Sequence, residues 1–325
     1  MPELRVSEQT VPGPATGMPA PVAAEHPNRI GSALVPVRVY EPGPEAGEPW
    51  ATLVWAHGGS FVRGDLDWPE ADWASRRLAE AGLRVYSVDY VLASDTVKAP
   101  APAADVAAVL REAASRHDGA ILVGGASAGA HLAVAAALAQ AARAGGSGDP
   151  GPGPAALALV YPTLHRVQRP APEISALTEG LPEQRRFSAA RIAEMYEFYL
   201  GAEAPGSGSG PGSDAIAEAD GDAGADAAPG VAADPTAEVV GELPSERLAV
   251  LPPVVIVNAE ADDLRASAEQ FADQLREAGV PVTEYVQPGT VHGYLNRPEA
   301  DAGATRDARA TIDALVEGLR AILAP

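Results

Sequence analysis

The sequence predicts an α/β fold with a mostly parallel central sheet and helices on both of its faces. Short apolar runs typical of strands recur along the chain, and segments with the apolar spacing of helices separate them. Two of these runs are followed by glycine pairs, Gly58-Gly59 and Gly124-Gly125. Because parallel strands need a crossover between them, this alternation predicts the sheet as well as its helical cover.

The expected strands rest on the pattern of apolar residues. Residues 35–40 alternate apolar and polar side chains, whereas residues 51–56 form a near-continuous apolar run, as in a strand buried on both faces. Further strands are expected at 83–91, 120–123, 156–161, 254–258 and 282–287. The expected helices lie at 69–81, 102–116, 130–144, 189–200, 265–278 and 306–323. The first of them stops at Gly82.

The alternation is interrupted after the strand at 156–161. Residues 201–235 consist mostly of Gly, Ala, Pro, Ser and acidic residues, with no basic residue. Such a segment cannot bury enough apolar surface to offset the entropy of ordering it. We therefore predict a disordered or loosely held acidic insertion, after which the α/β pattern resumes.

Composition narrows the function classes. The net charge of −21 disfavours nucleic acid and anionic membranes as partners. No apolar run reaches the ~18 residues of a membrane span, and residues 1–17 lack the apolar centre of a secretory signal, so a cytoplasmic location is expected. The absence of cysteine excludes disulfides, thiolate metal sites and a cysteine nucleophile. A homodimer remains possible on this evidence.

The strongest chemical signal is the pentapeptide Gly125-Ala126-Ser127-Ala128-Gly129 between an expected strand and an expected helix. A serine on such a sharp turn exposes its hydroxyl, and small flanking residues are needed because the chain passes close to itself. The structural alternative is an Ala/Gly-rich helix start with Ser127 as its cap. The strand–turn–helix context favours Ser127 as a nucleophile.

A second signal, His57-Gly58-Gly59-Ser60-Phe61, directly follows the buried strand at 51–56. Acyl transfer needs N–H groups aimed at the developing oxyanion, and a glycine-rich loop after an early strand can supply them. We expect His57 itself to be structural. Trp68 and Trp73, near this loop, fit either a substrate pocket or the core.

Two further signals follow the last two expected strands. His292 lies in Val291-His292-Gly293, and Asp262 begins Asp262-Asp263-Leu264-Arg265. A serine hydroxyl needs an imidazole to take its proton and a carboxylate to orient that imidazole, here in the chain order Ser, Asp, His. Asp263 and Glu260 are the alternative acids, and we expect Asp263 to cap the helix that starts near Leu264.

Together these motifs resemble the hormone-sensitive-lipase-like esterases of the α/β-hydrolase superfamily. The resemblance runs from about residue 35 to the C-terminus and is interrupted by the acidic insertion. The stretches that carry it are His57-Gly58-Gly59-Ser60-Phe61-Val62-Arg63-Gly64-Asp65, Val88-Asp89-Tyr90-Val91-Leu92-Ala93, Gly124-Gly125-Ala126-Ser127-Ala128-Gly129, Leu251-Pro252-Pro253, Asp262-Asp263-Leu264-Arg265 and Val291-His292-Gly293-Tyr294.

The resemblance implies an α/β-hydrolase fold and a triad of Ser127, Asp262 and His292. It further implies oxyanion donors on the backbone of Gly59, Ser60 and Ala128, with Gly58 shaping the loop. Ser60 stands where the family more often has a third glycine, and Val91 replaces an arginine of the family pattern. No cofactor or metal is implied.

The implied domain plan places a core at 35–162 and 246–325. Residues 1–34 would form a short partial cap, and residues 163–245, including the acidic insertion 201–235, would form a small lid. The expected activity is hydrolysis of small, short-acyl esters through an acyl-enzyme. Amide hydrolysis or acyl transfer by the same triad stays open. So does a non-catalytic receptor for a small ligand, although the receptors that resemble this family lack the histidine that is present here as His292.

Overall fold

The structure is a computed structural model that describes residues 3–14, 34–144, 153–201 and 234–324. Its centre is an eight-stranded sheet in the order β1-β2-β4-β3-β5-β6-β7-β8. β3 to β8 run parallel to one another, and β1 and β2 join antiparallel at one edge. The strands are β1 (Leu4–Pro12), β2 (Leu34–Pro42), β3 (Ala51–Ala56), β4 (Leu83–Val88), β5 (Ile121–Ala126), β6 (Ala156–Val160), β7 (Val254–Ala261) and β8 (Val282–Val291).

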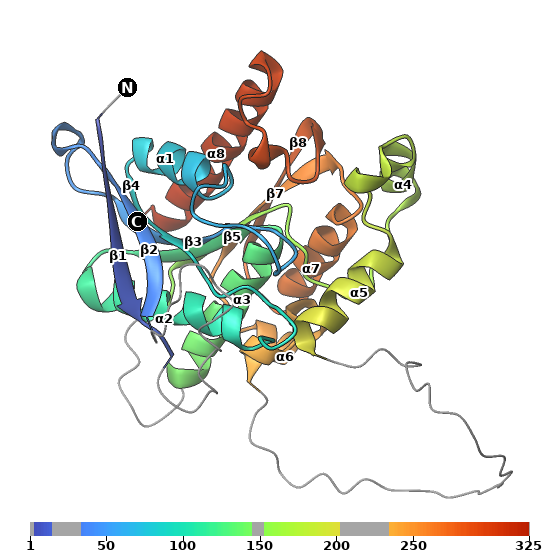
Figure 1. Ribbon diagram of the computed structural model, residues 1–325, viewed down its shortest axis with the longest axis horizontal. Coiled ribbons are helices and arrows are strands. Elements are labelled where there is room, and N and C mark those ends of the chain that lie inside the picture. Colours follow the sequence, from blue (N-terminus) through green and yellow to red (C-terminus); the bar gives the residue numbers. More distant parts are fainter. Residues whose placement is uncertain (1–2, 15–33, 145–152, 202–233, 325) are drawn as a thin grey trace, which may run out of the picture.

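Helices cover both faces of this sheet, as predicted (Figure 1). They are α1 (Asp72–Glu80), α2 (Ala101–Arg116), α3 (Ala128–Ala144), α4 (Pro172–Glu179), α5 (Ala189–Leu200), α6 (Ser245–Leu248), α7 (Arg265–Glu277) and α8 (Ala302–Leu323). Alternate residues of β3 belong to two separate hydrophobic cores, one on each face of the sheet. Leu53 and Trp55 pack with α1 and α8, whereas Val54 and Ala56 pack with α2, α3 and α7. This double burial explains why β3 is an almost continuous apolar run.

The N-terminal segment differs from its expectation. We predicted a short partial cap at 1–34. Residues 4–12 instead form edge strand β1, which pairs along its whole length with β2, and residues 15–33 of the predicted cap lie outside the described residues. Only Val11 of β1 is buried, so the apolar signal of a strand is weak there.

The chain between β6 and β7 contains α4, α5, α6 and short 3₁₀ turns. α5 was expected, but α4 was missed because it is short and buries only Ile174 and Thr178. In Figure 1, α4 and α5 lie beyond α7, at the end of the sheet where β7 and β8 lie. The predicted acidic insertion at 201–235 lies almost wholly outside the described residues.

The parallel strands β3, β5, β7 and β8 all end at the same edge of the sheet, where ligands of such sheets bind. Each of the four sequence motifs follows one of these ends. Of the helices that the structure describes, none combines the length and apolar character needed to cross a membrane.

Candidate active site

Ser127 occupies the tight turn between β5 and α3. Its backbone is left-handed, with φ of 53°, a conformation costing roughly 1 kcal/mol or more for a residue with a side chain. The turn passes close to the neighbouring strand: a Cβ on Gly129 would lie 2.1 Å from the carbonyl oxygen of Ala56. A Cβ on Gly125 would lie 2.4 Å from that same oxygen. Glycine is therefore required on both sides of Ser127.

Ser127, His292 and Asp262 are brought together from three strand ends. Ser127 Oγ lies 3.0 Å from His292 Nε2, and His292 Nδ1 lies 2.7 Å from Asp262 Oδ2. A carboxylate can only accept, so Nδ1 carries the proton and Nε2 is left to accept from the serine hydroxyl. The second oxygen of Asp262 accepts from the backbone N–H of Leu264, at 2.9 Å, which fixes the carboxylate.

Two aromatic rings pack against the imidazole of His292. The ring of Phe187 lies edge-on at 4.5 Å between centroids, and that of Tyr161 lies at 5.0 Å. Arg185 donates to the backbone carbonyl of His292 at 3.1 Å. Phe187 and Arg185 both belong to the segment between α4 and α5, so this segment contacts His292 directly.

Asp263 does not cap α7, contrary to the prediction. The N-cap position of α7 is Leu264, without a side-chain cap. The Asp263 carboxylate instead accepts from Thr178 Oγ1 at 2.7 Å, from the backbone N–H of Phe187 at 2.8 Å and from Arg186 Nε at 3.1 Å. It thus attaches the α4–α5 segment beside the triad, a role that the local sequence around residue 263 cannot reveal.

The glycine-rich loop after β3 faces Ser127. Gly59 and Ser60 line the cavity above the serine, and Ser60 and Phe61 have left-handed backbones. Among the described residues, no acceptor faces the N–H groups of Gly59 and Ser60. The N–H of Gly58, by contrast, donates to Glu70 Oε2 at 2.7 Å, so Gly58 shapes the loop and is not available to a substrate.

Glu70 was not singled out from the sequence, yet it connects three parts of the site. Its other oxygen accepts from Tyr161 at 2.6 Å and from Asn296 Nδ2 at 2.9 Å. Burial, followed by the charge of Glu70, raises the pKa of Tyr161 well above its usual range, which keeps this hydroxyl protonated as a donor. An acid near a helix start is ordinary in sequence, so only its distant partners identify Glu70.

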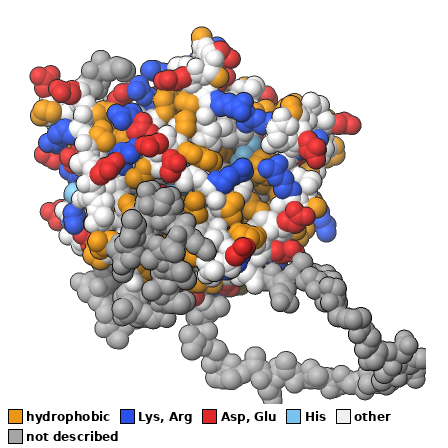
Figure 2. All heavy atoms as spheres, viewed as in Figure 1, with side chains coloured by type: hydrophobic (Ala, Val, Ile, Leu, Met, Phe, Trp, Pro, Cys, Tyr) orange, Lys and Arg blue, Asp and Glu red, His pale blue; other side chains and the backbone are white. Residues whose placement is uncertain are grey.

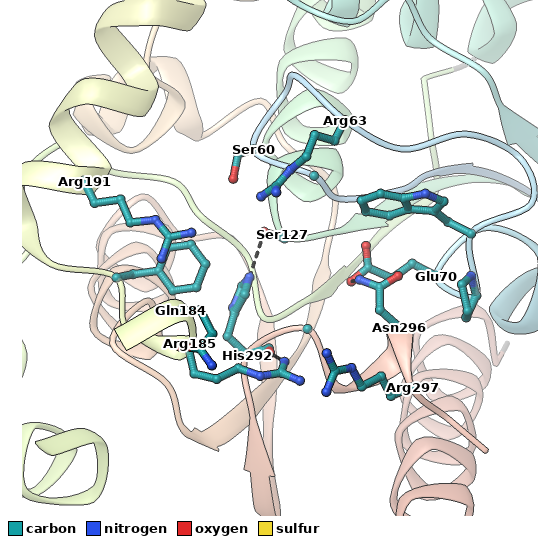
Figure 3. A pocket seen from close by; sticks show the side chains of 15 residues that line it. Ser60, Arg63, Glu70, Ser127, Gln184, Arg185, Arg191, His292, Asn296 and Arg297 are labelled. Atoms are coloured by element: carbon teal, nitrogen blue, oxygen red, sulfur yellow. Dashed lines mark hydrogen bonds between the residues drawn. The ribbon is translucent and has the colours of Figure 1, made fainter. Parts of the chain in front are cut away.

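A cavity of about 340 Å³ opens above Ser127 and His292. Trp68 lines it, whereas Trp73 packs in the core with α8. The remaining lining includes Arg63, Gln184, Arg185, Phe187, Arg191, Asn296 and Arg297. Figure 3 shows these polar side chains arranged around the Ser127–His292 contact.

His57 takes no part in the hydrogen bond between Ser127 and His292. It is buried, with Nδ1 2.7 Å from the carbonyl oxygen of Gly58 and its ring stacked on Tyr90. Burial lowers its pKa, which favours the neutral form. Within the described ranges, no group of three or more His, Asp or Glu side chains could hold a metal ion.

Comparison with known proteins bears on the family and the fold of the chain. A family profile described as alpha/beta hydrolase fold matches residues 53–208 and 216–296. An arylesterase of Saccharolobus solfataricus is 38% identical over 61 residues, which are 19% of this chain and 20% of that protein. The alignment thus spans about a fifth of this relative's length.

Solved structures match along nearly the whole chain. A bacterial heroin esterase is 25% identical with a TM-score of 0.66, covering 98% of this chain and 85% of its own. An esterase of Pyrobaculum calidifontis is 24% identical with a TM-score of 0.69, covering 99% and 86%. These matches and the family profile confirm the predicted α/β-hydrolase fold. The chain therefore belongs to the α/β-hydrolase family that contains the hormone-sensitive-lipase-like esterases.

Proposed function

We propose that the protein is a serine carboxylesterase that hydrolyses small esters through an acyl-enzyme, with Ser127, His292 and Asp262 as its triad. The observation that carries this proposal is the continuous chain of contacts from Asp262 through His292 to Ser127, at 2.7 and 3.0 Å. Membership of an esterase-containing family and the esterases among its structural relatives support the same chemistry.

In the first half-reaction, Ser127 Oγ attacks the ester carbonyl while its proton passes to His292 Nε2. The protonated imidazole then gives that proton to the departing alkoxide, which leaves as an alcohol. Asp262 holds His292 in the required tautomer and stabilises its positive charge. In the second half-reaction, water attacks the acyl-enzyme with His292 again as base, and a carboxylic acid is released.

The oxyanion would be held by the backbone N–H groups of Gly59, Ser60 and Ala128. The first two line the cavity beside Ser127 and have no acceptor among the described residues. Ala128 is the first residue of α3, where N–H groups are unpaired within the helix and the helix dipole favours negative charge. The hydrogen bond from Gly58 to Glu70 keeps this loop in place.

We further propose that the segment between α4 and α5 serves as a lid, because Phe187 and Arg185 cover His292. A cavity of about 340 Å³ lies at the lower end of the usual volume range of ligand pockets, which favours short acyl chains.

A panel of p-nitrophenyl esters from acetyl to palmitoyl tests the proposal. We expect turnover of the short esters and little of the long ones. Ser127→Ala should lower turnover by roughly 10⁴- to 10⁶-fold, by analogy with other triads. More than a tenth of the activity surviving in this variant would exclude Ser127 as the nucleophile. The absence of any turnover by the unaltered protein would instead favour a receptor.

A further inference from the structure

The cavity above Ser127 is positively charged, although the chain as a whole is strongly acidic. Four of the lining side chains are arginines, and Glu70 is the single acid among them. Both oxygens of Glu70 already accept from Gly58, Tyr161 and Asn296. The chain has 44 acidic and 23 basic residues, yet four of the basic residues line this one cavity: Arg63, Arg185, Arg191 and Arg297.

These arginines lack the acidic partners that most other arginines of the fold have. Within the described part of the chain, no carboxylate lies within ion-pair distance of any of the four. Arg191 donates to the backbone carbonyl of Arg186 and lies over the ring of Phe187, so neither contact neutralises its charge. In Figure 2, Lys and Arg side chains border a hollow on this face.

Arg185 and Arg297 form a pair at one side of the cavity. They come from distant segments, one before α5 and the other directly after the short turn at Tyr294–Asn296, and their guanidinium groups point toward each other in Figure 3. Partial burial, followed by the positive charge of Arg297, lowers the pKa of Arg185. Two like charges this close repel each other, and an anion bound between them removes that repulsion.

We propose that the ester substrate carries an anionic group of the carboxylate class, which Arg185 and Arg297 bind while the ester carbonyl lies at Ser127. Planar guanidinium groups match a carboxylate with two parallel hydrogen bonds, a geometry that neutral esters cannot use. This inference rests on the proposed esterase function. The cavity volume of about 340 Å³ limits the substrate to a compact molecule, such as a monoester of a short dicarboxylic acid.

The test compares two esters of equal length, monomethyl glutarate and methyl pentanoate, by titrating the acid released. We expect kcat/KM to be about tenfold higher for the charged ester, as for a charge-assisted hydrogen bond in a partly exposed site. In Arg297→Gln the ratio of the two kcat/KM values should fall close to one. Arg309→Gln is the matched control, since Arg309 is exposed on α8 and does not line the cavity.

A binding measurement separates this inference from the proposed function. Glutarate titrated calorimetrically into Ser127→Ala should bind about tenfold more tightly than into Ser127→Ala with Arg297→Gln. Adding Arg309→Gln instead should change nothing. Two results would overturn the anion site: hydrolysis of both esters at equal rates, or an affinity for glutarate that Arg297→Gln leaves unchanged. Tighter binding of inorganic phosphate than of glutarate would overturn the carboxylate class. If neither ester is hydrolysed, the esterase proposal fails while calorimetry still decides the anion site.

Discussion

Replacing Asp263 by alanine should destabilise the protein far more than a lost helix cap would. The change removes the acceptor for three donors: the hydroxyl of Thr178, the backbone N–H of Phe187 and the guanidinium of Arg186. Thr178 is fully buried, and without Asp263 its hydroxyl keeps only the longer contact to the backbone carbonyl of Ser175, at 3.3 Å, so the lost hydrogen bond costs about 1 kcal/mol. The unpaired N–H of Phe187 costs a similar amount, about 1 kcal/mol. The Arg186 side chain is 35% exposed, so solvent screening limits its share to less than about 1 kcal/mol.

The sum is about 3 kcal/mol, compared with the ~1 kcal/mol of a lost cap. For a chain of this size, each kcal/mol lowers the melting temperature by roughly 2–3 °C, so Asp263→Ala should melt about 6–9 °C lower in calorimetry. Asp263→Asn should cost less, because the amide oxygen can still accept from Phe187 and Arg186 while the amide nitrogen donates to Thr178.

Asp273→Ala is the matched control. It removes the same charge from a position on α7, ten residues further along the chain. Asp273 is exposed, and within the described residues its ion-pair partner is the exposed Arg276, so the effect should stay within about 0.5 kcal/mol. Hydrogen exchange should show faster exchange across 172–187 in Asp263→Ala, because this segment has lost its attachment. A melting temperature lowered by less than about 3 °C, with unchanged exchange there, would refute this account of Asp263.

Two further predictions concern Asp262 and His131. Asp262→Asn should preserve the melting temperature but lower kcat by about 10²- to 10⁴-fold, since an amide cannot select the tautomer of His292 that accepts from Ser127; unchanged ester hydrolysis would move the orienting acid elsewhere. Burial lowers the pKa of His131 to about 3. Between pH 6.5 and pH 3, therefore, this histidine is protonated in the unfolded chain but stays neutral in the folded protein. Stability from this group is therefore present above pH 6.5 and is lost as the pH falls toward 3, by about 2 kcal/mol between pH 7 and pH 5. Urea unfolding at pH 7 and at pH 5 measures this loss of unfolding free energy. The loss should be about 2 kcal/mol smaller in His131→Gln than in the unaltered protein, and equal losses in the two proteins would contradict this role of His131.

The sequence predicted those features whose signal is local. The run at 51–56 and the turn around Ser127 are readable because burial on both faces and close chain passage restrict the residues allowed there. Edge strand β1 was missed because only one of its residues is buried.

Within the site, features held by distant partners were missed. Asp263 contacts residues more than 75 positions away, and Glu70 contacts Asn296 across 226 positions. The meeting of Arg185 with Arg297 likewise depends on the folded chain, since each arginine alone resembles an ordinary surface residue. Long-range contacts of this kind leave no periodicity or spacing in a single sequence.

The arginines around Ser127 also bear on the departure of the product. Hydrolysis of any ester, charged or not, releases a carboxylic acid that ionises at neutral pH, with a pKa of about 4. The new carboxylate forms beside Ser127, in a cavity lined by four guanidinium groups. When the carboxylate product leaves the cavity, its negative charge is separated from the positive charges of the arginines. Product release therefore has an electrostatic barrier, which dissolved salt lowers by screening. Product release, more than acyl transfer, then sets how turnover responds to ionic strength.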